Sequence, residues 1–170
     1  QITKVSKEFA DVYKGDYAHF TLKEISEQPD SISQAGNNDQ IQQFVDGIKQ
    51  AKNLYITGSG TSYNAAEIAK YLMSKFAKIK INTVIASELP FSPDDIEPDS
   101  TLVAISQSGE SADVLEAVKI AKESNANVLS IVNHLNSSLS QESSLVMGLN
   151  CGPEIGVAAT KSFTSQLAIL

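Results

Sequence analysis

Short apolar runs rich in valine, isoleucine and leucine alternate with helical patterns along most of this chain. Five such runs predict strands, at residues 53–57, 81–86, 101–106, 128–133 and 145–149. The runs are nearly continuous, which indicates strands that are covered by helices on both faces. The predicted fold is an α/β three-layer sandwich with a five-stranded parallel sheet, of the flavodoxin-like kind.

Helices are predicted between the strands by apolar residues at helical spacing. They cover residues 41–52, 63–76, 112–123 and 158–170, with a short helical turn at 136–141. The buried face of the helix over 63–76 is expected to consist of Ala65, Ala69, Leu72 and Phe76. That of the helix over 112–123 is expected to consist of Val114, Leu115, Val118 and Ala121.

The two ends of the chain differ from its middle. Residues 1–37 are polar and mixed, and we predict a linker with an amphipathic lead-in helix, followed by one domain over 38–170. Phe20, Ile25 and Ile32 form the expected apolar face, and Pro29 is expected to interrupt it. The apolar face of the last predicted helix is still running at residue 170, so we expect a piece of a longer protein.

The composition excludes several classes of partner. Hydrophobic residues make up 42% of the 170 residues and charged residues 19%, which is typical of a globular protein. A net charge of −7, with basic residues scattered along the chain, disfavours nucleic acid and anionic membranes as partners. No apolar run approaches the ~20 residues of a membrane span. The single cysteine, Cys151, fits a reducing compartment, and we expect a cytoplasmic protein.

Two turns dense in hydroxyl groups follow predicted strands. GSGTS (58–62) comes after the first strand and SQSGES (106–111) after the third, and each opens a helix. In an open α/β sheet, ligands bind at the carboxyl ends of the strands, where helix N-termini present free N–H groups to an anion. Serine and threonine add small donors, and no lysine or arginine accompanies them. The two turns predict a sugar-phosphate site that needs neither metal ion nor cofactor.

A simpler interpretation of the same serines stays open. Ser62 and Ser111 could serve only as helix N-caps, and Ser106 and Ser108 only as turn residues.

Other ligand motifs fail on particular residues. In GSGTSY, Tyr63 stands where a dinucleotide-binding turn requires glycine or alanine. The chain has no phosphate-binding loop with lysine and no nucleophile elbow. The two histidines, His19 and His134, lie in no cluster of metal ligands, so no metal site is predicted.

The same motifs resemble a known family. GSGTS, SQSGES and EIGVAATKSF (154–163) are similar to the sugar isomerase (SIS) domain family. Within it, the lead-in GDYAHFTLKEISEQP (15–29) and IASEL (85–89) resemble the isomerase domains of the glucosamine-6-phosphate synthases, also called glutamine–fructose-6-phosphate aminotransferases. The resemblance covers nearly the whole chain.

The resemblance implies a set of phosphate- and sugar-binding residues: Thr61, Ser62, Ser106, Gln107, Ser108, Ser111 and Val157, the last through its backbone. Ser111 stands where the family commonly has threonine, and Ser59 where several relatives have cysteine. Glu154 is a possible sugar-positioning residue, and a loop carboxylate that caps or positions fits it better than a general base.

The resemblance also implies what the chain lacks. Glutaminase chemistry needs an N-terminal cysteine, and residue 1 is Gln1, while Cys151 is expected to be a small buried residue. The chain would be the first of two SIS halves and would hold no catalytic residue. The parent enzyme would be a homodimer that converts fructose 6-phosphate and glutamine to glucosamine 6-phosphate and glutamate, towards UDP-GlcNAc. A non-catalytic SIS sensor, or an isomerase or deglycase for another sugar phosphate, remains an alternative.

Overall fold

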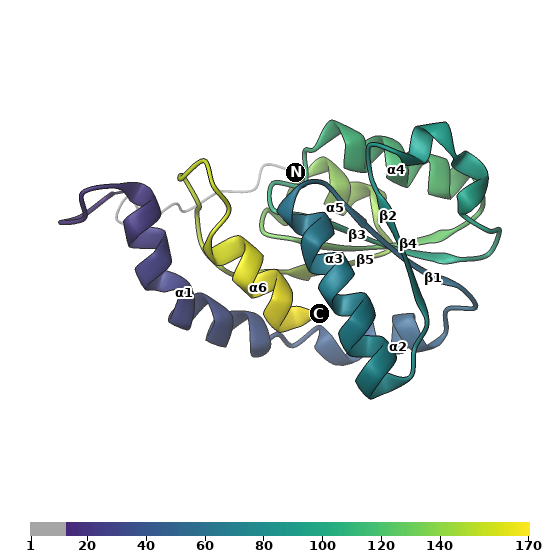
Figure 1. Cartoon of the computed structure of the whole chain (residues 1–170), viewed down its shortest axis with the longest axis horizontal. Helices are drawn as coiled ribbons and strands as arrows, with labels where there is room; N and C mark the ends of the chain where they lie inside the picture. The colour runs from purple at the N-terminus through teal and green to yellow at the C-terminus, as the bar shows by residue number, and fades with distance from the viewer. Residues whose placement is uncertain (1–12) are drawn as a thin grey trace, which may run out of the picture.

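A parallel sheet between two layers of helices forms the body of the computed structural model, which describes residues 13–170 (Figure 1). Residues 1–12 of the expected linker lie outside the described part of the chain. The sheet order is β2-β1-β3-β4-β5, and every neighbouring pair is parallel. The strands are β1 (Leu54–Gly58), β2 (Ile81–Ile85), β3 (Thr101–Ser106), β4 (Asn127–Val132) and β5 (Leu145–Gly148).

This strand order is the flavodoxin-like one, so the predicted fold class is confirmed. The bounds of all five strands agree with the predicted ranges to within one residue. The chain runs from β1 to one edge of the sheet and then returns past β1 to β3. The switch point of the sheet therefore lies between β1 and β3, where two successive crossovers diverge.

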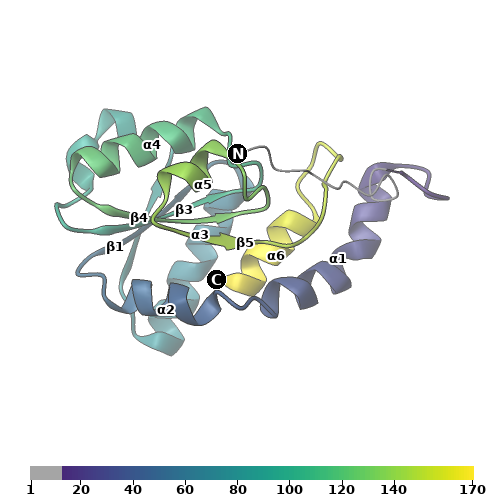
Figure 2. The same cartoon turned by 180° about the vertical axis from the view of Figure 1, so that it is seen from behind.

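Helices cover both faces of the sheet (Figures 1 and 2). One core joins the sheet to α4 and α5, and the other joins it to α2 and α3, with the end of α6 packed against it. The helices are α2 (Ile41–Lys49), α3 (Thr61–Leu72), α4 (Ala112–Glu123), α5 (Ser138–Glu142) and α6 (Lys161–Ile169), with 3-10 turns at Leu89–Phe91 and Pro93–Asp95. None of the helices within residues 13–170 combines the length and hydropathy of a membrane span.

The end of α3 departs from the predicted helix. After Leu72 the chain forms a π-helical segment, Met73–Ala77, in place of further α-helical turns. Ala65 and Ala69 are fully buried as expected, but Leu72 is 43% exposed and Phe76 is 72% exposed. A π-turn holds more residues than an α-turn, so the positions after Leu72 rotate away from the predicted face.

An additional helix, α1 (Phe20–Gly36), packs on α6 on the side away from the sheet (Figure 1). The expectation that Pro29 interrupts this helix is wrong, because α1 runs through Pro29 without a break. Proline lacks the N–H that would bond to the carbonyl of Ile25. The side-chain Nε2 of Gln28 donates to that carbonyl instead, at 3.3 Å. A neighbouring side chain thus replaces the missing backbone bond.

The predicted face of α1 is also wrong. Ile25 and Ile32 are 48% and 41% exposed, whereas Glu24, Ser31 and Ala35 are the buried residues of the helix. The partner of α1 is not an apolar sheet face but α6 and the loop before it, which offer backbone N–H groups and a lysine. Polar side chains on α1 bond to these groups, so the polar side turns inward.

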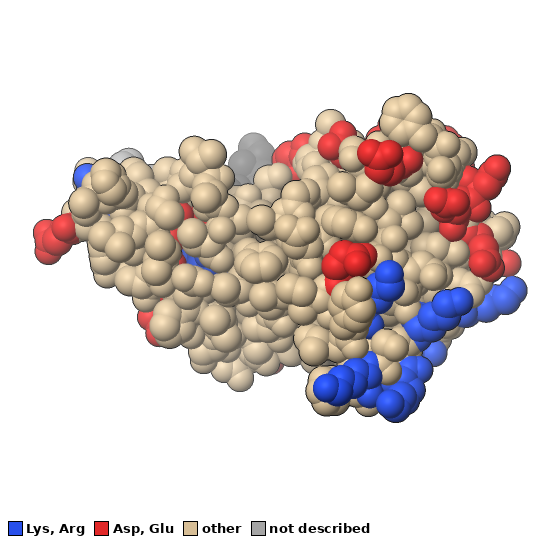
Figure 3. Space-filling model, in the orientation of Figure 1, with Lys and Arg blue, Asp and Glu red and all other residues tan. Residues whose placement is uncertain are grey.

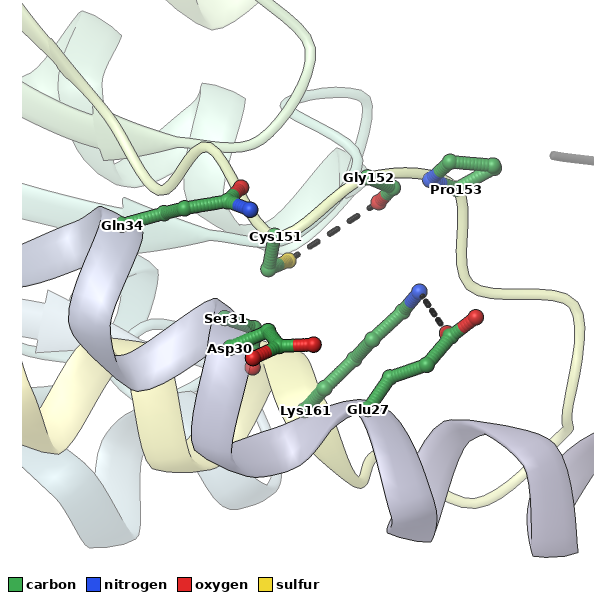
Figure 4. A pocket seen from close by; sticks show the side chains of 8 residues that line it. All are labelled: Glu27, Asp30, Ser31, Gln34, Cys151, Gly152, Pro153 and Lys161. Carbon is green, nitrogen blue, oxygen red and sulfur yellow. Dashed lines mark hydrogen bonds and ion pairs between the residues drawn. The ribbon is translucent and has the colours of Figure 1, made fainter.

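An ion pair joins the two helices (Figure 4). The Nζ of Lys161 lies 2.6 Å from Oε2 of Glu27, and the lysine side chain is only 5% exposed. Burial alone would raise the pKa of Glu27, but the hydrogen bond and the charge of Lys161, with a smaller contribution from Lys23, hold that pKa below its usual value. The pair therefore favours the ionised carboxylate and stabilises the docking of α1.

Glu27→Gln should lower the free energy of unfolding by about 1–2 kcal/mol at pH 7, between the values for exposed and buried pairs. Because the folded-state pKa of Glu27 is lowered, its carboxylate contributes stability above the usual pKa of 4.5, and this is lost as pH falls through the folded value. Thermal denaturation of the wild type and of Glu27→Gln from pH 7 downwards tests this. The melting temperatures of the two proteins should converge below pH 4.5. A difference that is constant with pH would contradict the assignment.

Candidate functional site

The two hydroxyl-rich turns meet at one edge of the sheet. β1 pairs with β3 so that Gly58 is opposite Ile105, and each strand then leads directly into its turn. A cavity of about 220 Å³ lies between the turns. Its lining residues are Ser59, Thr61, Ser62, Ile105, Ser106, Gln107, Ser108, Ser111 and Val114. The prediction that the turns share one cavity at the carboxyl edge is confirmed.

The size of this cavity limits what it can hold. Its volume of about 220 Å³ is below the roughly 300–1,000 Å³ of typical small-molecule sites. A phosphate group with part of a sugar is therefore a better match than a nucleotide.

Two hydroxyl oxygens of the second turn are hydrogen-bond acceptors within the turn itself. The Oγ of Ser106 accepts from the backbone N–H of Gly109 at 3.0 Å, and the Oγ of Ser108 accepts from that of Glu110 at 3.1 Å. A serine hydroxyl has one hydrogen to donate and two lone pairs. Because the turn uses a lone pair of each oxygen, each O–H hydrogen remains available to donate into the cavity.

The alternative in which Ser62 serves as a helix cap is wrong. The N-cap of α3 is Gly60, not Ser62. Ser111 is the N-cap of α4 by position, but its side chain makes no capping hydrogen bond. The turn role of Ser106 and Ser108 does hold. It is compatible with ligand binding, since it occupies only their acceptor sites.

Gly109 makes the second turn possible. Its φ of +70° lies in the left-handed region, and a Cβ built on it would collide with the side chain of Ser137. The carbonyl of Gly109 accepts from the backbone N–H of Leu139, at 3.0 Å, in the short helix α5. Only glycine allows the turn to approach α5 this closely, so the position of Ser108 depends on it.

Lysine side chains do not line the cavity. They gather instead where α3 ends and β2 begins, at the amino edge of the sheet (Figure 3). On the face in Figure 3, several basic residues that are scattered in the sequence therefore lie close together. Charge stabilisation at the cavity is left to hydroxyl groups, backbone N–H groups and the N-termini of α3 and α4.

The acidic residue of the second turn is held away from the cavity. The carboxylate of Glu110 accepts from the backbone N–H and the hydroxyl of Ser138, both at 2.8 Å. These bonds keep the pKa of Glu110 below its usual value, so it stays ionised beside α5.

Glu154 and Val157 do not line this cavity. The carboxylate of Glu154 accepts from the backbone N–H groups of Thr160 and Ser162, at 3.0 and 3.1 Å, and from both hydroxyls. It therefore caps the N-terminus of α6, which explains why this helix starts three residues after the predicted position. Val157 is fully exposed at the tip of the loop 153–160. Their contact with a sugar remains a prediction.

Glu24 is a residue that the sequence interpretation missed. It is 2% exposed, and its Oε1 accepts from the backbone N–H groups of Ile155 and Gly156, at 2.6 and 2.8 Å. Its Oε2 accepts from the hydroxyl of Thr160 at 3.4 Å. Glu24 thus fixes the loop that carries Val157. The signal in the sequence is weak: Glu24 and Ser31 are seven residues apart and so lie on the same side of α1, but both are polar and resemble surface residues.

A cavity of about 310 Å³ lies between α1 and the segment after β5 (Figure 4). Its lysine, Lys161, is already paired with Glu27, so it offers no free cation. Burial, with the charge of Glu154 in addition, raises the pKa of the Cys151 thiol to about 11. Since the thiolate is the nucleophile, Cys151 is inert at neutral pH, as expected for a small buried residue.

Gly156→Ala should destabilise the protein by about 1–3 kcal/mol, because the new Cβ would collide with the Glu24 carboxylate. The loop hydrogen bonds of Glu24 would be displaced as well. The matched control is Gly36→Ala, since a Cβ at Gly36 meets nothing within 4 Å. Thermal denaturation should separate the two variants, and equal melting temperatures would disprove the role of Glu24.

Comparison with known proteins identifies relatives for this arrangement. The SIS domain family matches residues 47–170. The glutamine–fructose-6-phosphate aminotransferase [isomerizing] of Pyrococcus horikoshii is 43% identical over 160 residues, covering 92% of this chain and 27% of the relative. That of Chlorobaculum tepidum is 36% identical over 181 residues, covering 100% of this chain and 30% of the relative. The chain thus spans less than a third of these relatives.

Solved structures give the same picture. The C-terminal domain of glucosamine-fructose-6-phosphate aminotransferase from Francisella tularensis has a TM-score of 0.83 and 39% identity, covering 92% of this chain and 46% of that one. Tagatose-6-phosphate ketose/aldose isomerase from Escherichia coli has a TM-score of 0.75 at 24% identity, covering 88% and 46%. The second likeness concerns the fold alone.

Proposed function

Because the chain belongs to the SIS domain family, we propose that it is the sugar-phosphate-binding first half of the isomerase domain of a glutamine–fructose-6-phosphate aminotransferase. The observation that carries this proposal is the cavity at the β1–β3 switch point, lined by hydroxyl donors from both turns. Residues 38–170 would form this SIS half, and the preceding residues, with α1, would link it to the remainder of the enzyme.

The proposed reaction converts fructose 6-phosphate and glutamine to glucosamine 6-phosphate and glutamate. In it, the chain binds the phosphate through Ser62, Ser106 and Ser108, with Thr61, Gln107 and Ser111 beside them. A phosphate bound at the sheet edge fixes the far end of the sugar, so that C1 and C2 are presented to groups that carry out the proton transfer. The backbone of Val157 would contact the sugar, and Glu154 would hold the start of α6.

The wider setting belongs to the same proposal. The enzyme would act in the cytoplasm as a homodimer, with a glutaminase part that supplies ammonia, in the pathway to UDP-GlcNAc. A sensor module or an isomerase for another sugar phosphate would use the same cavity, so the choice between them rests on turnover by the complete protein.

Ser62→Ala and Ser108→Ala should each weaken the binding of fructose 6-phosphate by roughly 1.5–3 kcal/mol, the scale of a hydrogen bond to a charged group. The melting temperature of the Ser108 variant should change little, because this hydroxyl caps no helix. That of the Ser62 variant should fall, because the buried Nε2 of Gln166 loses its acceptor. Titration calorimetry measures the affinities, with Ser26→Ala on exposed α1 as the control. Unchanged affinity in both serine variants would disprove phosphate binding at this cavity.

The 170 residues alone should bind fructose 6-phosphate and convert none of it. Aldose–ketose conversion needs a base at C1 and C2 and an acid to open the ring, each worth about 10²–10⁴-fold in rate. The cavity is lined by neither a carboxylate nor a histidine. Incubation with fructose 6-phosphate, followed by assay of glucose 6-phosphate, tests this. Turnover that Glu154→Gln abolishes would contradict the proposal and make Glu154 a base.

A further inference from the structure

The helix α6 contacts the candidate site through a side chain that does not line its cavity. Gln166, on α6, is 1% exposed, and its side-chain Nε2 lies 3.0 Å from the Oγ of Ser62, which is 104 residues earlier in the chain. Ser62 itself is 7% exposed and lines the cavity between the two turns. A residue that does not line the cavity therefore contacts one of its hydroxyl groups directly.

The chemistry of this contact fixes the direction of the Ser62 hydroxyl. An amide nitrogen only donates, so Oγ of Ser62 must accept from Gln166 and cannot direct its own hydrogen at that nitrogen. Within residues 13–170, the Ser62 hydroxyl donates to no protein atom, so its hydrogen remains available to the cavity that Ser62 lines. The hydroxyl of Ser62 therefore resembles those of Ser106 and Ser108. Each oxygen accepts one hydrogen bond, and each hydrogen is left to donate into the cavity.

A second observation separates this contact from ordinary packing. Oε1 of Gln166 is buried and has no hydrogen-bond partner among the described residues. A buried polar atom without a partner destabilises the folded state by about 1–3 kcal/mol. An apolar side chain of similar size would avoid this cost, so the contact of Nε2 with Ser62 is what a glutamine adds at this position.

We propose that Gln166 is a positioning residue that holds the Ser62 hydroxyl as a donor towards the cavity. The proposal rests on the proposed function, since it assumes that phosphate binds there. The hydroxyls of Ser62, Ser106 and Ser108 each accept one hydrogen bond from the protein, so each can donate its hydrogen to a ligand. The fully ionised phosphate of a sugar phosphate offers only acceptor oxygens, which matches these donors. Gln166 completes this set on the β1 side. Among the described residues, no backbone N–H donates to Ser62 as those of Gly109 and Glu110 donate to Ser106 and Ser108.

Gln166→Met tests the proposal in the complete protein as it is translated. This change keeps the volume of the side chain but removes the donor. We expect the Kd for fructose 6-phosphate, and for inorganic phosphate as the minimal probe, to rise by about 5–10-fold, the effect of one net hydrogen bond. The melting temperature should stay the same or rise, because the unpartnered Oε1 is removed.

Calorimetry separates a positioning role from a structural one. A positioning residue changes Kd and leaves the number of sites per chain unchanged, whereas a damaged fold lowers the number of sites. Gln166→Glu should weaken binding more than Gln166→Met, because a carboxylate accepts the Ser62 hydrogen and repels phosphate. In the Ser62→Ala background, Gln166→Met should have no further effect on Kd.

Three results would each overturn the inference while leaving the proposed function intact. One is a Gln166→Met protein that binds as tightly as the wild type while Ser62→Ala binds more weakly. The second is a Gln166→Met effect on Kd that persists in full in the Ser62→Ala background. The third is a Gln166→Met effect that appears only as a lower melting temperature and fewer sites. If the wild type binds neither probe, the proposed function itself fails, and the inference fails with it.

Discussion

The parallel pairing of β1 with β3 is the interaction on which the candidate site depends. Its register sets Gly58 opposite Ile105, so the turns that follow the two strands begin at the same height. In the flavodoxin-like order these strands flank the switch point, where the crossovers leave in different directions. A shift of this register would separate the hydroxyls of Ser62 and Ser108 and leave no shared cavity.

The site gathers donors without a cation. No lysine lines the cavity, and the lysines gathered in Figure 3 lie at the opposite, amino edge of the sheet. Lys161, which lines a second cavity, is paired with Glu27. What remains is a set of hydroxyls whose oxygens already accept hydrogen bonds, together with two helix N-termini. Under the proposed function, such a site would bind phosphate through its acceptor oxygens, as suits a group that anchors a substrate and does not react.

The parts of the fold that depend on residues close together in the sequence could be predicted. Strand runs and the glycine-serine turns are local patterns, and parallel strands place their carboxyl ends at one edge, so the meeting of the turns followed. Glu24, Gln166 and the polar face of α1 could not be predicted in this way. Their bonds join residues more than a hundred positions apart, and a buried glutamate or glutamine looks like a surface residue in the sequence.

Two kinds of local information misled the prediction. Pro29 indicates a helix break, yet Gln28 supplies a substitute bond to the carbonyl of Ile25. Ile25 and Ile32 suggested a buried face, but the partner surface is polar, so burial follows the hydrogen bonds. The π-helical end of α3 is a third departure, because nothing in Met73–Ala77 marks it by composition. The roles of Val157 and Glu154 towards a sugar remain predictions.

The most direct test of the account is a crystal structure of the complete protein with fructose 6-phosphate bound. We expect the phosphate between the two turns, with its oxygens within about 2.5–3.0 Å of the hydroxyl oxygens of Ser62, Ser106 and Ser108. We also expect the Gln166 amide to keep its contact with Ser62. A phosphate bound at the lysine-rich amino edge of the sheet, or in the cavity beside α1, with the turns empty, would contradict the account.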